Sequence, residues 1–408
     1  MEEVKLTTDG NNKKKTNWSV LLGAAFLMAT SSIGPGFLTQ TTVFTQQLGA
    51  SFGFVILVSL LLDIFAQLNI WRIIVVTGLR GQEIANKVLP GLGVFLAILI
   101  VFGGLAFNIG NVAGAGLGLN AMLNIDPIMG AVISAVFAIF IFLFKEAGKV
   151  MDKATQVAGA IMILLMLYVA ISTVPPVGEA VLRTFVPSKI SILSIVTLVG
   201  GTVGGYITFA GGHRLLDAGI KGVGAIPDVT KSSVSGIGIT GVMRIALFLA
   251  VLGVVSQGLQ IDPANPPASV FNLALGEFGY RIFGVIMWAA AITSVVGAAY
   301  TSVSFIKTFH PLLEKYQNWL IIAFIVLSTV TFAIIGKPVN VLILAGALNG
   351  LILPIALGTL LIAANKKSIV GSSYKHPLWL TIPGILVVII MGILGIMTLF
   401  EQIPLIFK

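Results

Sequence analysis

The sequence of 408 residues contains no cysteine and only three histidines, His213, His310 and His376. The lack of cysteine excludes disulfide bonds, thiolate metal sites and cysteine nucleophiles, and three histidines leave little for a soft-metal site. Charged residues are also scarce, at 10% of the chain, whereas a water-soluble domain carries roughly 25%. So few charges cannot keep a soluble surface hydrated. Disorder, a nucleic-acid-binding domain and a secreted disulfide scaffold are therefore excluded.

Apolar residues make up 57% of the chain, and 46 residues are glycine, which is more frequent in membrane helices than in soluble ones. Crossing the hydrocarbon of a bilayer takes roughly 20 mostly apolar residues. The sequence therefore predicts an all-α polytopic membrane protein. Eleven segments qualify as spans: 18–46, 52–78, 91–123, 127–144, 152–174, 190–215, 233–257, 268–306, 318–335, 339–363 and 378–400.

The distribution of basic residues predicts the orientation of these spans. With the N-terminus and its polar tail (1–17) in the cytoplasm, eighteen lysines and arginines fall on the inner side and five on the outer side. Such an excess is typical of cytoplasmic loops. It accounts for the net charge of +9 without a nucleic-acid partner. Trp18, Trp319 and Trp379 stand at helix starts, where interfacial tryptophans are common. We expect a multi-pass protein of the cell membrane, surrounded by lipid.

Two of the predicted helices contain glycine-rich interruptions. The first carries Gly34-Pro35-Gly36, and the sixth carries four glycines within 200–205. Proline removes a backbone donor and glycine tolerates unwinding, so we expect both segments to be unwound. A kink or a close-packing site is the alternative at each. Broken helices in matching positions are typical of transporters with inverted repeats. This predicts one repeat over 18–174, an inverted one over 190–363, and an additional helix over 378–400.

Polar residues cluster beside both interruptions, and none of them is a carboxylate or a histidine. Hydroxyls, amides and exposed backbone N–H groups suit a neutral or anionic solute better than a bare cation. The predicted binding residues are Gly34, Pro35, Gly36, Thr39, Gln40, Asn108, Asn111, Thr202, Gly204, Gly205 and Tyr206.

The chain resembles the NRAMP family of secondary transporters, which have a LeuT-type fold. The resemblance rests on GASFGF at 49–54, NIGNVAGAGLGLN at 108–120, FGVIMWAAAITSVVGAAYTS in the eighth helix and LILPIALGTLLIAANKKSIVG at 351–371. It implies proton-coupled uptake of manganese, iron or related divalent metals, with metal ligands on the first and sixth helices.

The ligand motifs that this resemblance implies are absent. The family's Asp-Pro-Gly-Asn is Gly-Pro-Gly-Phe at 34–37, and the best match to its Met-Pro-His is Gly-Gly-Tyr at 204–206. The third-helix acids that the family ties to proton movement are replaced by Asn108 and Asn111. A dehydrated divalent cation needs strong oxygen, nitrogen or sulfur ligands. The sequence therefore favours a small organic anion, such as a carboxylate, as substrate. Proton-coupled transport of a divalent metal is the alternative.

Two charged residues lie inside predicted helices. Asp63 is a lone carboxylate in the second helix, and Arg244 lies in the seventh. An intramembrane acid is a functional candidate because burying its charge is costly. A structural ion pair that involves either residue is equally compatible with the sequence.

Two further sets of residues are candidates for coupling and gating. Ala298, Thr301 and Ser302 resemble the sodium-site pattern of LeuT-type transporters, with helix packing as the alternative. His213 and Arg214 end the sixth helix near the inner surface, where they are gate candidates or a structural cap.

The sequence has neither the acid–base set of an enzyme nor the charged rings or filter loops of a channel. We therefore expect a secondary active transporter that works by alternating access. It would carry a small solute or ion, with H⁺ or Na⁺ as the coupling ion and no cofactor.

Overall fold

The computed structural model describes residues 33–406, without the side chains of 145–149, 152, 308 and 401–406. The predicted tail 1–17 and the first half of the predicted first span, Trp18 included, lie outside the described residues. Within them, the regular elements are α-helices and short 3-10 turns, with no strand. This confirms the predicted all-α class.

The long helices follow the predicted order. They are α2 (Pro35–Leu48), α3 (Phe52–Thr77), α5 (Leu92–Leu123), α6 (Pro127–Leu143), α7 (Lys145–Ser172), α9 (Ile192–Val203), α10 (Gly205–Asp217), α11 (Ile226–Ser256), α12 (Pro266–Ile306), α14 (Gln317–Ile335), α15 (Pro338–Ala364) and α17 (Leu378–Ile406).

In the described part of the chain, nine segments are long and apolar enough to cross a membrane. One of them, Pro35–Thr77, contains both α2 and α3, and Pro127–Leu143 is an additional, shorter apolar helix. Each of the eleven predicted spans thus has a helical counterpart. Trp319 and Trp379 are exposed near the starts of α14 and α17, as expected of interfacial side chains. The orientation and the bounds of the two repeats stay predictions.

The structure also contains features that hydropathy does not reveal. Four short helices were not expected: α4 (Gly81–Val88), α8 (Val177–Phe185), α13 (Pro311–Lys315) and α16 (Lys367–Val370). The predicted straight span over 268–306 is bent in α12 at Gly276, whose φ of 66° is accessible to glycine without strain. Hydropathy measures burial in hydrocarbon, so it detects neither short polar helices nor a single-residue bend.

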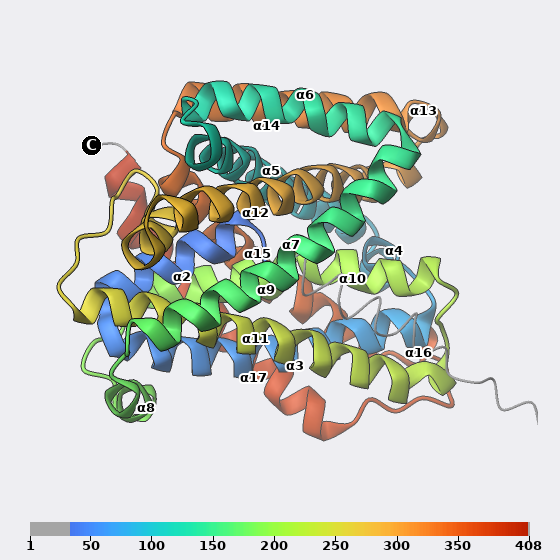
Figure 1. The fold of residues 1–408 in the computed structure, drawn as a ribbon. Helices are drawn as coiled ribbons and strands as arrows, with labels where there is room; N and C mark the ends of the chain where they lie inside the picture. The colour runs from blue at the N-terminus through green and yellow to red at the C-terminus, as the bar shows by residue number, and fades with distance from the viewer. Residues whose placement is uncertain (1–32, 407–408) are drawn as a thin grey trace, which may run out of the picture.

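The buried apolar side chains form two clusters. One is built mainly from α3, α9, α10 and α15 and includes Trp71 and Phe209. The other is built mainly from α5, α6, α7, α11 and α12 and includes Phe271. Helix α2 contributes Phe44 to the first cluster and Phe37 to the second. In Figure 1, α6 and α14 run along the top of the bundle and α3 and α17 along the bottom, with α2 and α9 between them.

Candidate functional site

Helix α2 begins at the predicted first interruption. Gly34 occupies the N-cap position, and Pro35 is the first helical residue, where its fixed φ suits the helix. Among the described residues, no side chain caps this end. A Cβ built on Gly34 would lie 3.4 Å from Ser294 Oγ and 3.7 Å from Asn111 Oδ1. Helix α2 therefore begins at Pro35 and includes Gly36, so the prediction that Gly36 is unwound is wrong. Because residues 1–32 lie outside the described part of the chain, an interruption of the first helix at Gly34 stays a prediction.

The break in the sixth helix is confined to Gly204. Helix α9 continues to Val203 and α10 begins at Gly205, so the prediction that residues 200–205 are all unwound is wrong. Gly200 is helical and packed against α15, where an added Cβ would collide with the backbone of Gly346 and Gly350. This glycine permits close helix packing, which was the alternative interpretation.

Asn349 of α15 stabilises the second break. It is fully buried, and its Oδ1 accepts a hydrogen bond from the Tyr206 backbone nitrogen at 3.4 Å. Its Nδ2 donates to the carbonyls of Gly103 at 2.9 Å and Ala345 at 3.0 Å. Buried backbone groups need such partners. The sequence-based prediction missed Asn349, although an amide within an apolar helix is itself a signal.

Gln40 of α2 lies against α9 and α15. Its Nε2 donates to the Leu342 carbonyl at 2.9 Å, and Gly201 and Gly346 pack against its side chain. The Gln40 Oε1 is buried without a hydrogen-bond partner among the described residues, and so is the Thr39 hydroxyl. Leaving a buried acceptor unsatisfied costs about 1–3 kcal/mol. These oxygens therefore indicate a place where water or a solute binds.

The polar residues of α5 have different neighbours. Asn108 Nδ2 donates to Ser328 Oγ of α14 at 3.1 Å. Asn111 instead reaches Gly34 at the first break. The Tyr206 ring packs on Phe107, with the ring centroids 5.5 Å apart. The structure thus brings Asn111 close to Gly34 and Tyr206 close to Gly204, and it directs the Asn108 amide toward α14.

Arg244 of α11 lies beside both breaks. Its Nη1 donates to Thr202 Oγ1 at 3.2 Å, and its Cζ lies 4.5 Å from the centroid of the Phe37 ring. Asp63 of α3 attracts Arg244 electrostatically and also interacts with Thr202. Neither Asp63 oxygen accepts a well-aligned hydrogen bond. The two charges that the sequence left unassigned therefore belong to one group.

The predicted sodium-site residues diverge. Ala298 and Ser302 are fully buried, and Ser302 packs against Gly104 of α5. Thr301 is only partly buried, and its carbonyl accepts a hydrogen bond from Ser304 at 2.6 Å. Consecutive residues of an α-helix point about 100° apart. Ser302 is therefore the more buried of the two hydroxyl residues, and the sodium site stays a prediction.

The two gate candidates also differ. The buried His213 accepts a hydrogen bond from the Gly81 backbone nitrogen at 3.0 Å, at the start of α4. Arg214 is exposed. The nearby Asp217 pairs with Arg80 at 2.6 Å. His213 therefore ties α10 to α4, as the structural-cap alternative requires, whereas a gating role for either residue stays a prediction.

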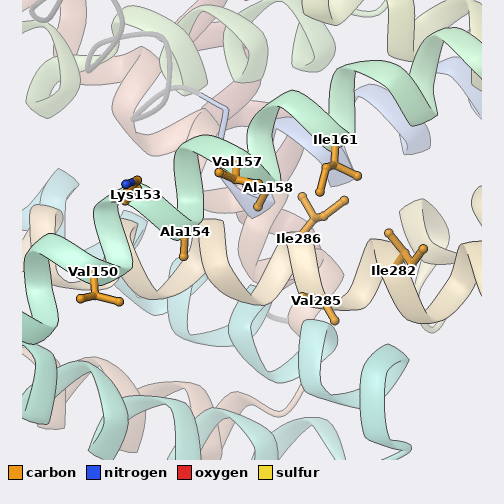
Figure 2. A pocket seen from close by; sticks show the side chains of 9 residues that line it. All are labelled: Val150, Lys153, Ala154, Val157, Ala158, Ile161, Ile282, Val285 and Ile286. Carbon is orange, nitrogen blue, oxygen red and sulfur yellow. The ribbon is translucent and has the colours of Figure 1, made fainter.

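The described residues contain no group of three or more His, Cys, Asp or Glu side chains that could hold a metal ion. The sequence from 18 to 62 contains none of these residue types either. An open groove lies elsewhere, between α7 and α12, as Figure 2 shows. Its lining is almost entirely apolar and includes no predicted site residue: Val150, Lys153, Ala154, Val157, Ala158, Ile161, Ile282, Val285 and Ile286. It is separate from the helix breaks.

The fold defines the class of protein. The chain superposes on a point mutant of the Eremococcus coleocola manganese transporter with a TM-score of 0.76 and 17% identity, covering 98% of this chain and 91% of that one. It superposes on MhsT in complex with L-phenylalanine with a TM-score of 0.62 and 15% identity, covering 94% and 98%. The protein therefore has the LeuT-type transporter fold, as predicted.

The sequence then defines the family within this class. Residues 25–401 match Nramp, described as natural resistance-associated macrophage protein-like. The chain is 69% identical over 404 residues to Uncharacterized membrane protein YcsG of Bacillus subtilis, covering 99% of each. It is 23% identical over 398 residues to Divalent metal cation transporter MntH of Aeromonas hydrophila, covering 91% of this chain and 94% of that one. The chain belongs to the NRAMP family. It is a membrane transporter and not an enzyme.

Proposed function

We propose that this transporter works by alternating access and carries a small organic anion, a carboxylate, between Gly34 and Gly204. The observation that carries the proposal is the chemistry of the buried polar atoms beside the breaks. Gln40 Oε1 and the Thr39 hydroxyl are buried with no hydrogen-bond partner among the described residues, and neither Gly34 nor Phe37 supplies a side-chain ligand. Unsatisfied polar groups at membrane depth are costly unless water or a solute meets them.

The start of α2 adds to this preference. The N-terminus of a helix carries partial positive charge and attracts anions. Transporters with broken helices use such ends for anionic groups of their substrates. The α2 end is uncapped and lies beside Asn111 and Ser294. The backbone N–H groups at this end and the Ser294 hydroxyl can donate hydrogen bonds to an oxyanion.

A divalent metal is the second candidate substrate, and the names of the similar proteins favour it. MntH is named as a divalent metal cation transporter, and the Eremococcus protein as a manganese transporter. Manganese would have to bind neutral oxygens such as Gln40 Oε1, which compensate little of its charge. The carboxylate is therefore the first choice on the chemistry of the site.

Binding to the purified protein discriminates the two substrates. Calorimetric and thermal-shift titrations would compare manganese with a panel of small carboxylates under the same conditions. We expect one or more carboxylates to stabilise the protein and manganese to leave it unchanged. Saturable manganese uptake into proteoliposomes at micromolar concentration, without carboxylate binding, would overturn the proposal in favour of the metal.

A further inference from the structure

We propose that Arg244 is the anchor that binds the carboxylate group of the substrate, an inference that rests on the proposed function. Its guanidinium touches both broken helices next to their breaks. Phe37, whose ring lies under the guanidinium, is the third residue of α2. Thr202, which accepts from Nη1, is the second-last residue of α9 before Gly204. The cation thus occupies the junction at which a solute between the breaks is held.

The unused donors of Arg244 lie on one edge of the guanidinium. Nη1 donates to Thr202, whereas Nε and Nη2 are buried and have no hydrogen-bond partner among the described residues. Nε and Nη2 point in the same direction, and this edge matches the two oxygens of a carboxylate. Arg244 is only 2% exposed, so a bidentate pair formed here would be shielded from water.

Asp63 is the acidic partner of Arg244, and neither of its oxygens is hydrogen-bonded to that edge. The carboxylate attracts the guanidinium across the α3–α11 interface, but it makes no well-aligned hydrogen bond to it. A buried pair held only for stability needs direct hydrogen bonds to repay its desolvation. The loose pairing instead keeps Arg244 charged and its donors available. The face of Phe37 adds a weaker cation–π stabilisation.

Gln40 extends this recognition to a second group of the substrate. Its Nε2 is committed to Leu342, so only the acceptor Oε1 is available. Oε1 lies against Gly201, the residue before Thr202 in α9. The substrate class is therefore a small carboxylate that also carries a hydrogen-bond donor, such as a hydroxyl or an N–H group.

The test compares a carboxylate with its neutral amide. The tightest acid from the binding panel and its primary amide would each be titrated calorimetrically into detergent-purified wild type and variants. A charge-assisted bidentate contact predicts that the wild type prefers the acid by roughly ten- to hundredfold. In Arg244→Gln this preference should be abolished, because acid binding weakens while amide binding changes little. Arg244→Lys should retain only part of it, since lysine lacks the fork.

Arg72→Gln is the matched control. Arg72 is half-buried and, like Arg244, has two nitrogens without a hydrogen-bond partner among the described residues, but its Cζ lies 5.9 Å from the centroid of the Trp379 ring, away from Gly34 and Gly204. The Arg72→Gln variant should keep the wild-type preference for the acid over the amide. If Arg244→Gln does not fold, the charge-neutral double variant Arg244→Gln with Asp63→Asn replaces it and should lack the preference equally.

The outcomes separate this inference from the proposed function. A wild type that binds a carboxylate, together with an Arg244→Gln or double variant that still prefers acid over amide, overturns the anchor and leaves the proposed function standing. A wild type that binds no carboxylate overturns both.

Discussion

Asn349 Oδ1 accepts a hydrogen bond from the Tyr206 backbone nitrogen at 3.4 Å, and this contact joins α15 to the break between α9 and α10. The same side chain donates to carbonyls of α5 and α15. The Asn349 amide therefore provides the Tyr206 N–H, two residues after Gly204, with an acceptor, and it links α10, α5 and α15. The break is preorganised by α15 rather than by the glycine-rich segment itself.

Replacing Asn349 by alanine should lower the free energy of unfolding by about 2 kcal/mol, because three buried hydrogen bonds are lost and the Tyr206 N–H is left unsatisfied. Thermal unfolding in detergent measures this. Asn365→Ala is the control, since Asn365 is exposed and bonds only to Leu361 of its own helix. Equal midpoints for the two variants would contradict a structural role for Asn349.

Gly200→Ala should separate α9 from α15, because the new methyl group would lie about 2.8 Å from the Gly350 Cα and closer still to the Gly346 carbonyl oxygen. Overpacking of this kind costs typically 1–3 kcal/mol. Gly238→Ala in α11 meets open space and should be neutral or stabilise by up to about 1 kcal/mol. Melting temperatures of the Gly200→Ala and Gly238→Ala variants in detergent would be compared with that of the wild type. A Gly200→Ala protein as stable as the wild type would show that the α9–α15 interface tolerates a methyl group.

His376, in the loop before α17, should make the protein acid-sensitive. It bonds to Tyr374 at 2.8 Å and to Asn69 at 2.7 Å, and burial together with the nearby Arg72 charge lowers its pKa to about 4. An unfolded histidine titrates near 6.5. Between these values the unfolded chain binds a proton that the folded chain excludes, so the free energy of unfolding decreases as the pH falls.

The expected loss attributable to His376 is about 2 kcal/mol between pH 6.5 and pH 5. Melting temperatures at pH 7.5 and pH 5 would be compared for wild type and His376→Gln, with the exposed His310→Gln as control. The acid-induced decrease should shrink in His376→Gln alone. An undiminished decrease would mean that other groups set the acid sensitivity.

Gln40→Ala should weaken solute binding roughly ten- to hundredfold if Oε1 accepts from a charged donor of the substrate, and less for a neutral one. Gln46→Ala tests the same change on an exposed position of α2 and should leave binding unaltered. Calorimetric titration of both variants with the same solute provides the measurement. A loss confined to protein stability, with unchanged affinity, would assign Gln40 to helix packing only.

The coupling ion should depend on which buried group takes part. If sodium drives uptake through Ser302, Ser302→Ala should weaken the sodium dependence while Thr301→Ala changes it little, because Ser302 faces the centre of the bundle. If protons drive uptake, Asp63→Asn should abolish the response to a pH gradient instead. Uptake into proteoliposomes under each gradient decides between them, and an unchanged response in all three variants would exclude both sites.

The spans and the start of α2 are local properties, and the sequence was sufficient to predict them. A segment of about 20 apolar residues has no stable place other than hydrocarbon. Pro35 cannot donate a backbone hydrogen bond, so it favours the first position of a helix, where α2 has it. The family resemblance also came from the sequence, through motifs that keep their order along the chain.

The tertiary structure decided what the polar residues do. Gly200 and Gly204 look alike in sequence and both lie against α15, but Gly200 is helical whereas the helix breaks at Gly204. Thr301 and Ser302 are adjacent, yet helix geometry directs only Ser302 to the centre. Arg244 became a candidate anchor only when Phe37 and Thr202 were seen around it. A residue's chemistry is local, whereas the groups it meets are set by packing between distant segments, and no single segment specifies that packing.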